Sequence, residues 1–347
     1  MRDDFDEVKF QGDYVSNEFG KFFASGGIRM SLSLPFIGTI GAGFIHYPLT
    51  HFTYAYSEEV RGSYRTQDGE YASKDPNAGY HNFNVDGVIL TSGIGVSTSI
   101  NILGDLKVSI GTSINITQPF ELNEQIKIDS LYSDLSNLSY YPNVENLYNI
   151  NSGKFISASA LINLNDNSIL GLSYESMLKL QTENYDVTID STNGLFQYWN
   201  DTEYLPLGVN YMKPQLVSFG WRYSPSSAKS LTINFQLDQV SYDNHINLND
   251  SKNWKFGFEY LTQLNTPVRG GLVYSTSSLN SIPSSTIFTF GSGKKIGKTE
   301  INISGTYQLY VYKYADLFIV ENDVRPDYYD MVRDSQLNLS LSILYSF

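Results

Sequence analysis

The chain contains 347 residues and no cysteine, and its 36 Asp and Glu residues outnumber 23 Lys and Arg residues, which gives a formal net charge of −13. Without cysteine there is no disulfide bond and no Cys-ligated metal, and an acidic chain without a Lys/Arg run is a poor partner for nucleic acid. No uninterrupted stretch of about 20 apolar residues predicts a transmembrane helix, and the acidic residues 1–7 lack the pattern of an export signal. The 27 Tyr and 20 Phe residues against 11 Pro favour strands.

Segments of alternating apolar and polar residues predict strands along the whole chain. Fourteen strands are expected, at residues 5–15, 28–36, 38–56, 89–102, 104–118, 154–164, 168–181, 214–225, 229–242, 252–262, 267–275, 284–293, 298–311 and 335–347. In the segment 104–118, Leu106 and Ile110 fall on one face while Lys107 and Ser113 fall on the other. An apolar face and a polar face, repeated from strand to strand, are typical of a membrane barrel with lipid outside and a polar lumen.

The last segment, residues 335–347, gives the clearest pattern. Six apolar residues share one of its faces: Leu337, Leu339, Leu341, Ile343, Tyr345 and Phe347. The segment is long for a globular strand of about 5–6 residues but suits a tilted membrane strand of about 9–11 residues plus its ends. The terminal Phe347, with Tyr345 two residues before it, is similar to the signal by which the assembly machinery recognises bacterial outer-membrane barrels. The alternative is an edge strand of a soluble β-sandwich.

These patterns predict the fold class and the location. We expect residues 1–347 to form a single all-β domain, an antiparallel transmembrane β-barrel of about 14 strands in the bacterial outer membrane. Short and long connections alternate, so the tight turns all fall on the side that holds the C-terminus, as periplasmic turns should. The long connections are expected to be extracellular loops at residues 57–88, 119–153, 182–213 and 312–334.

Most of the acidity belongs to these expected loops. They carry 22 of the 36 acidic residues and 8 of the 23 basic residues. Such acidity is expected either of a solvated surface that repels like charges or of divalent-cation bridging to lipopolysaccharide. None of the loops has the spaced ligands of a calcium-binding loop, so neither a metal site nor a cofactor is predicted.

The sequence also argues against an enzyme. His46 and His51 lie five residues apart on one expected strand, so they should point to opposite faces, which prevents a two-His metal site there. No Gly-x-Ser-x-Gly, His-Glu-x-x-His, Walker or dinucleotide motif occurs. A Ser/His pair formed across strands would leave no local signature and stays open. We therefore predict no catalytic residue.

Several strand motifs carry a family resemblance. They are residues 31–36 followed by 38–44, then residues 254–260, 267–274 and 288–293. Over residues 28–347 the chain resembles the FadL-type outer-membrane transporters of long-chain fatty acids and other hydrophobic compounds. That family has an N-terminal hatch inside the barrel with an Asn-Pro-Ala segment, which this sequence lacks. The resemblance therefore implies either an N-terminally truncated product or an unplugged lumen.

The resemblance implies capture of the ligand by outer loops, passage into the lumen and lateral exit through a kinked third strand. The third expected strand, residues 38–56, contains Gly41, Gly43 and Pro48. Proline cannot donate a ladder hydrogen bond and glycine weakens a strand, so we expect a disrupted ladder from Gly41 to Pro48 that serves as a lateral gate. The alternative is that Pro48 only marks a bulge where the strand leaves the membrane.

Ligand capture is expected in the loops 119–153 and 182–213, which hold more large apolar residues than solvated connections need. The expected contacts are Leu131, Leu135, Tyr198, Trp199 and Leu205. Packing of these loops on one another is the alternative explanation.

The predicted function is passive uptake of hydrophobic small molecules such as long-chain fatty acids, with outer-membrane lipid, lipopolysaccharide and the assembly machinery as further partners. The alternative is a non-transporting barrel of the same type that serves as a binding or structural protein partner in a surface secretion or assembly complex.

Overall fold

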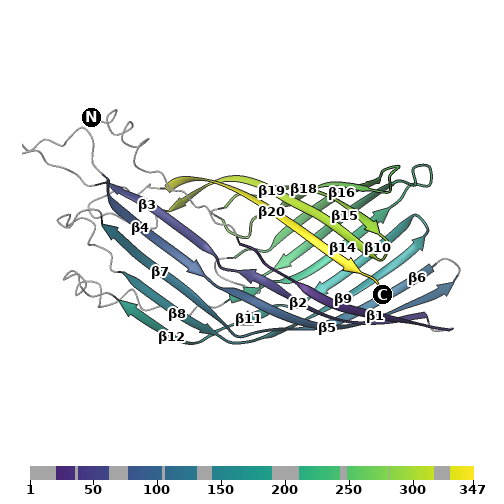
Figure 1. The fold of residues 1–347 in the computed structure, drawn as a ribbon, viewed down its shortest axis with the longest axis horizontal. Coiled ribbons are helices and arrows are strands. Elements are labelled where there is room, and N and C mark those ends of the chain that lie inside the picture. The colour runs from purple at the N-terminus through teal and green to yellow at the C-terminus, as the bar shows by residue number, and fades with distance from the viewer. Residues whose placement is uncertain are drawn as a thin grey trace, which may run out of the picture.

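The computed structural model describes residues 21–35, 38–61, 77–103, 106–130, 143–189, 211–242, 248–280, 282–315 and 329–347. Within these ranges every regular element is a strand (Figure 1). No helix in the described part of the chain is long and apolar enough to span a membrane.

Thirteen described strands form one curved sheet, in which every neighbouring pair is antiparallel. In spatial order they are β1 (Gly26–Leu34), β2 (Gly38–His51), β5 (Val88–Leu103), β6 (Leu106–Thr117), β9 (Lys154–Asn165), β10 (Ser168–Glu175), β14 (Gln215–Tyr223), β15 (Leu231–Ser241), β16 (Ser251–Leu261), β17 (Pro267–Ser275), β18 (Ser285–Ile296), β19 (Thr299–Ala315) and β20 (Tyr329–Tyr345). This sheet confirms the predicted fold class, an antiparallel transmembrane barrel.

The two edge strands of the sheet are β1 and β20. Because eleven strands lie between them in an antiparallel sheet, β1 and β20 run in the same direction. One further antiparallel strand between them would close the barrel, which matches the even strand number of single-chain bacterial barrels. The one predicted strand that is not among these thirteen is the first in the chain, residues 5–15, which lies outside the described residues.

Large apolar side chains cover the outside of the barrel. In β16, Trp254, Phe256 and Phe258 are 43 to 52% exposed, whereas Lys255 and Gly257 between them face the lumen and are less exposed. In β20 the apolar residues of the predicted outward face are exposed in the same way. This exposed apolar band is the surface that lipid covers in a membrane barrel.

The short turns lie at the end of the barrel where the chain terminates (Figure 1). Two of them contain a residue in the left-handed region, Asn265 with φ 54° and Gly297 with φ 60°. Asparagine and glycine are the residues that adopt this conformation most readily, so the sequence of these turns suits their geometry. The predicted short turns are therefore confirmed.

The predicted long loops are wrong in extent, because much of each is strand. A second sheet of five strands continues the wall outward: β12 (Thr182–Ile189), β8 (Val144–Ile150), β7 (Phe120–Ser130), β4 (Asn77–Asp86) and β3 (Tyr54–Arg61). A third, two-stranded ladder joins β11 (Leu178–Leu180) to β13 (Tyr211–Lys213).

Strands therefore occupy part of every predicted loop: 57–88, 119–153, 182–213 and 312–334. In the last of these loops the strands are the ends of β19 and β20. The physical reason is that the strands continue outward past the apolar band with the same inward and outward period of two, although not every inward residue there is apolar. Within β7, Leu122 and Ile126 lie on the inner face, and Glu121 and Lys127 lie on the solvent face.

Six neighbouring wall strands are interrupted at one level, which we call the crease. The interruptions fall at residues 52–53, 87, 118–119, 151–153, 176–177 and 214. Hydrogen bonds link these breaks to one another or to the wall beside them, since Phe52 N–H donates to the Gly87 carbonyl at 2.8 Å and Thr117 N–H to the Gly153 carbonyl at 2.9 Å. Prolines at 119 and 214 cannot donate to a ladder, which gives two of the breaks a local cause.

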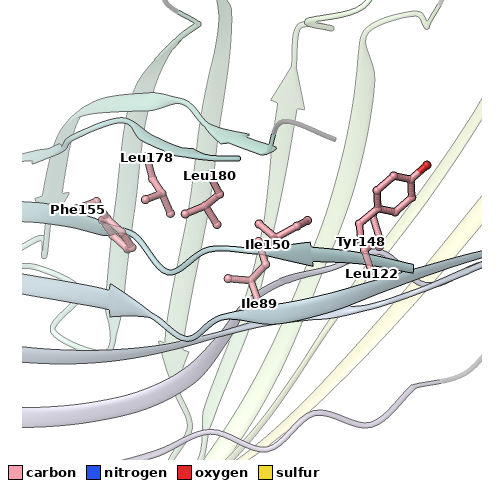
Figure 2. Packing of buried hydrophobic residues seen from close by; sticks show 7 residues of the cluster. All are labelled: Ile89, Leu122, Tyr148, Ile150, Phe155, Leu178 and Leu180. Carbon is pink, nitrogen blue, oxygen red and sulfur yellow. The ribbon is translucent and has the colours of Figure 1, made fainter. Parts of the chain in front are cut away.

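The buried hydrophobic core sits at the crease. It contains Ile89, Leu122, Tyr148, Ile150, Phe155, Leu178 and Leu180, which we call the crease cluster (Figure 2). Elsewhere the described barrel is a single-layered sheet with one face outward and the other toward the lumen, so it has little other buried apolar packing.

Candidate functional site

The crease cluster lies on the lumenal side of the wall. Its seven side chains are 0 to 4% exposed, whereas Ile156, the neighbour of Phe155 on the outward face, is 49% exposed. Figure 2 shows Leu178 and Leu180 directed from β11 toward Phe155 and Ile150. Five partly buried residues pack around the cluster: Leu49, Phe52, Val85, Phe120 and Tyr211. The lumen thus has an apolar patch built from strands that are distant in sequence.

Glycine at position 153 makes this packing possible. A Cβ atom added to Gly153 would lie 2.5 Å from Leu180 Cδ2 and 2.6 Å from Leu178 Cδ1. Such distances are well inside van der Waals contact, so any larger residue would displace the two leucines. The break at residues 151–153 is therefore a place where side chains of β11 pack directly against the wall backbone.

A charged pair borders the cluster. Lys213 Nζ lies 4.8 Å from the centre of the Phe155 ring and 2.8 Å from Glu175 Oε2. The Lys213 side chain is 13% exposed and that of Glu175 is 35% exposed. A cation over an aromatic face is attracted by the ring quadrupole, and partial desolvation strengthens the attraction. The partly buried residues around the cluster offer an apolar surface for a hydrocarbon, and the ion pair beside it offers a partner for a polar end.

The lumen next to the cluster is lined by small and polar residues. Asn115 Nδ2 donates hydrogen bonds to Ser113 Oγ and Ser157 Oγ, both at 3.2 Å. Gly93 and Gly95 occupy lumenal positions of the neighbouring strand β5. Small side chains on this part of the wall leave room inside the barrel.

On the wall formed by β14 to β19, two pairs of opposite charges face the lumen. Lys255 Nζ lies 2.7 Å from Asp238 Oδ2, and the Asp238 side chain is only 2% exposed. Arg269 Nε lies 2.6 Å from Glu259 Oε2, and Arg269 also donates to Asn302 Oδ1 at 2.9 Å. A buried carboxylate needs such a partner, because an unpaired buried charge is strongly destabilising.

The expected break at the gate glycines does not occur. Gly41 pairs with Ser31 and Ser97 in an unbroken register, and Gly43 is paired on both sides in the same way. The ladder with β5 is regular through Pro48 and shifts only between Pro48 and Thr50. Glycine thus left the ladder intact, since its backbone N–H and carbonyl pair like those of any other residue.

The irregularity matches the alternative of a bulge at Pro48. Leu49 is the extra residue, and it packs against the crease cluster. The gate role of Gly41, Gly43 and Pro48 stays a prediction.

The bulge also makes the prediction for the two histidines wrong. His46 pairs with Ser92 and His51 pairs with Val88. Ser92 and Val88 are four residues apart on β5, so the two histidines lie on the same face. The extra residue Leu49 shifts the alternation by one position, which sequence spacing alone does not show.

His46 Nδ1 lies 3.0 Å from Ser92 Oγ, so a Ser/His pair does exist across two strands. No described carboxylate or amide hydrogen-bonds the other ring nitrogen of His46, so the third group of a triad is missing from the described part of the chain. The same residues hold no group of three or more His, Cys, Asp or Glu that could bind a metal ion.

The five predicted capture residues, Leu131, Leu135, Tyr198, Trp199 and Leu205, lie outside the described residues. At the C-terminus, the rings of Tyr345 and Phe347 lie 5.1 Å apart at an interplanar angle of 83°. Their role as an assembly signal stays a prediction.

Sequence reasoning missed Phe155, Glu175, Leu178, Leu180 and Lys213 as site residues. Leu178 and Leu180 fell in the predicted strand 168–181, whose alternation places both on one face. Lys213 is the only basic residue of the predicted loop 182–213. That isolated charge was the one available signal, but it does not indicate the contact with Phe155.

The chain was compared with known proteins. No protein-family model matches it, and no curated protein matches it. Among solved structures, a Pseudomonas aeruginosa FadL homologue matches with a TM-score of 0.52 and 13% identity, over 89% of this chain and 78% of that chain. The Pseudomonas putida toluene transporter TodX matches with a TM-score of 0.52 and 11% identity, over 96% of this chain and 87% of that chain. At such low identity the similarity concerns the fold.

Proposed function

We propose, on the premise that this chain has the FadL-type outer-membrane transporter fold, that it is a passive channel for hydrophobic small molecules in a bacterial outer membrane. The exposed apolar band supports contact with outer-membrane lipid. Acidic outer segments suit divalent-cation bridging to lipopolysaccharide, and Tyr345 and Phe347 suit recognition by the assembly machinery. The structurally similar TodX is a toluene transporter.

The observation that carries this proposal is the lumenal crease cluster. A solvated barrel interior needs no patch of large apolar side chains, and burying one such side chain against a hydrocarbon is worth roughly 1.5–3 kcal/mol. Ligand sites typically combine an apolar lining with a few placed polar groups. Here the partly buried apolar residues that pack around the cluster supply the lining, and Lys213 supplies a charge at its border.

Long-chain fatty acids fit this combination as substrates. The acyl chain would lie on the lumenal side of the cluster, and Lys213 would attract the carboxylate. Glu175 competes for the same ammonium group at 2.8 Å, so the carboxylate must share or replace that partner. The segments with Leu131, Leu135, Tyr198, Trp199 and Leu205 are proposed as the capture surface.

Lateral exit is proposed beside the Pro48 bulge. Two observations support this location. Leu49 at the bulge packs against the cluster, and the pairing of β2 with β1 ends at His46, so Tyr47–His51 have no described partner strand on that edge. An apolar ligand on the cluster would thus lie close to a weakly paired part of the wall.

Uptake by cells tests the proposal. A bacterial strain without its own long-chain fatty-acid transporter would express either the wild type or Leu180→Gln, which places an amide in the cluster. Wild type should restore uptake of a labelled long-chain fatty acid, and Leu180→Gln should reduce it several-fold at equal surface abundance. Leu172→Gln, on the outward face at 52% exposure, is the matched control and should leave uptake unchanged.

A second candidate function is a non-transporting barrel that serves as a structural partner in a surface secretion or assembly complex. The close packing of the crease cluster, with every member at most 4% exposed, favours it because these side chains pack on one another and leave no surface for a passing ligand. If the wild type restores no uptake of either fatty acid or toluene while it assembles normally, this second function is supported and the channel proposal fails.

A further inference from the structure

A recess lies in the lumenal wall at the outer ends of β15 to β19, on a different part of the wall from the crease cluster. Its volume is about 350 Å³. Its floor is the row in which Asn253 pairs with Ser275, and Ser275 pairs with Ser285. The outward neighbours of this row, Trp254 and Tyr274, are 45% and 46% exposed on the membrane face, so the row itself faces the lumen.

Hydroxyl and amide groups dominate the lining, and two hydrogen bonds hold them in place. Ser275 Oγ donates to Asn253 Oδ1 at 2.6 Å, and Gln308 Nε2 donates to Ser285 Oγ at 2.9 Å. Each bond uses one end of an amide and fixes its orientation. The Asn253 Nδ2 donors and the Gln308 Oε1 acceptor form no side-chain bond with the described residues and remain available to a ligand.

A third polar group adds to this set. Ser251 is 7% exposed and lines the same recess, and its hydroxyl makes no hydrogen bond with the described residues. Apolar contact is also present, since Val240, Tyr242 and Leu279 complete the lining.

None of the described residues that line the recess has a charged side chain. The nearby carboxylates are already engaged. Asp238 pairs with Lys255 at 2.7 Å, and Asp250 accepts hydrogen bonds from Ser241 Oγ at 3.1 Å and from the Tyr242 N–H at 2.9 Å. The recess therefore offers directed donors and acceptors without a net charge that would attract an ion.

We propose that this recess binds a neutral polyhydroxylated ligand, a mono- or disaccharide unit, which is either a free sugar or the head group of a glycolipid. The two oriented amides and the hydroxyls match a ring of hydroxyl groups, and the apolar residues match the C–H faces between them. The volume lies at the small end of the range of ligand sites, about 300–1,000 Å³, and suits a ligand of this size. This site is distinct from the proposed uptake of hydrophobic molecules and does not depend on it.

Calorimetric titration of the purified full chain tests the site. The protein is held in dodecyldimethylamine oxide, a detergent without a sugar, and is titrated with maltose and separately with dodecyl maltoside. Dodecyldimethylamine oxide has the same alkyl chain as dodecyl maltoside, so any binding of the alkyl chain alone is already present before the titration. We expect saturable binding that Asn253→Leu weakens by at least about fivefold, since the loss of one hydrogen bond has an effect of that size.

A second variant and a control keep the test decisive. Ser251→Leu fills the recess without touching the bond between Ser275 and Asn253, and it should abolish binding even if Asn253→Leu fails to fold. Ser97→Ala removes a lumenal hydroxyl on β5, outside the recess, and should leave the affinity unchanged.

Each pattern of binding has a stated meaning. Binding of both ligands supports the site with free sugar as a source, and binding of dodecyl maltoside alone supports it with a glycolipid head group as the source. If neither maltose nor dodecyl maltoside binds, or if Ser251→Leu leaves their binding unchanged, the proposal is overturned.

Discussion

Lys213 Nζ lies 4.8 Å from the centre of the Phe155 ring. Lys213 ends the short strand β13, and Phe155 lies at the start of β9, so the contact ties together two wall strands on either side of the crease. The ion pair with Glu175 at the end of β10 adds a third. The Lys213 side chain thus joins strands at the crease, where the ladders of the main sheet are interrupted.

Replacing Lys213 by Met should separate the effect of its charge on stability from the effect of its packing. The Met side chain keeps apolar contact with Phe155 but removes the cation and leaves the half-exposed Glu175 without its partner. We expect a loss of about 1 kcal/mol in unfolding free energy, because the pair is partly solvated. Denaturant unfolding in detergent measures this loss.

The same variant discriminates between ligands. Uptake of a fatty acid should fall more than uptake of toluene, since only the fatty acid has a carboxylate for Lys213 to attract. In Glu175→Gln, where the competing carboxylate is removed, uptake of the fatty acid should be equal or faster. An equal reduction for both ligands in Lys213→Met would show that Lys213 acts only through packing.

Gly153→Ala should destabilise the crease. The added Cβ would lie 2.5 Å from Leu180 Cδ2, so the leucine side chains must shift, and overpacking of this kind costs about 1–3 kcal/mol. Gly26→Ala is the matched control, because a Cβ there meets nothing within 4 Å. Thermal unfolding followed by gel mobility compares the two, and equal midpoints would contradict the close packing.

Arginine substitutions test which residues face the membrane lipid. Leu341→Arg and Ile110→Arg should each cost about 2–4 kcal/mol, the cost of an arginine near the bilayer midplane. Leu264, which lies in a tight turn and is 80% exposed, should accept arginine at little cost. Folding into vesicles at increasing urea measures all three, and wild-type stability of the first two variants would contradict the lipid-facing assignment.

The fold class could be predicted because strand alternation is a local property. Each outward residue is followed two positions later by another, and that period is visible without knowing the partner strand. The outer sheet was missed for a related reason. Its inner face carries Glu124 and Asn146 among the apolar residues Leu122, Ile126 and Tyr148, so its alternation is interrupted where the structure continues as strand.

The candidate site was harder to predict, because its geometry depends on pairing. Leu49 reads as an ordinary strand residue in the sequence, and only the shift between Pro48 and Thr50 shows that it is the extra residue of a bulge. The crease cluster joins Ile89 to Leu180 through five strands. No spacing along the chain indicates that these residues meet, since register between distant strands sets the contact.

The outer sheet should lose stability in acid through His81. Burial lowers the pKa of His81 from 6.5 to about 4, so the folded protein keeps this side chain neutral where the unfolded chain binds a proton. The contribution is fully present above pH 6.5 and is lost as the pH falls toward 4. In His81→Gln this pH dependence should flatten. Hydrogen exchange of β4 amides measures it, and an unchanged profile would exclude His81 as the cause.

Glu124 should show the opposite dependence. Burial raises the pKa of its carboxyl group, and the hydrogen bond from Asn146 lowers the pKa only in part. Because the folded state favours the protonated form, ionisation opposes folding once the pH rises above the unfolded value of 4.5. Glu124→Gln, which keeps the shape without the charge, should therefore stabilise the outer sheet at pH 7. Measurements of β7 hydrogen exchange at pH 4 and pH 7 check the sign, and a variant that is less stable at pH 7 would contradict it.

The Pro48 bulge provides the final test, on lateral exit. Deleting Leu49 and replacing Pro48 by Val removes the extra residue and restores a ladder donor, so the wall between β2 and β5 should become regular. The deletion also withdraws an apolar contact from the crease cluster. If the ligand leaves through this part of the wall, uptake of a labelled fatty acid should slow several-fold while surface abundance stays the same. Gly220→Ala is the control, because Gly220 lies in a regular part of the wall on β14, where an added Cβ meets only the Phe235 carbonyl oxygen at 3.8 Å, and its uptake should equal that of the wild type. Leu49→Ala separates the loss of the apolar contact from the loss of the bulge. Uptake reduced equally by Leu49→Ala and by the deletion would assign the effect to the cluster, and unchanged uptake in the deletion would remove lateral exit at this position.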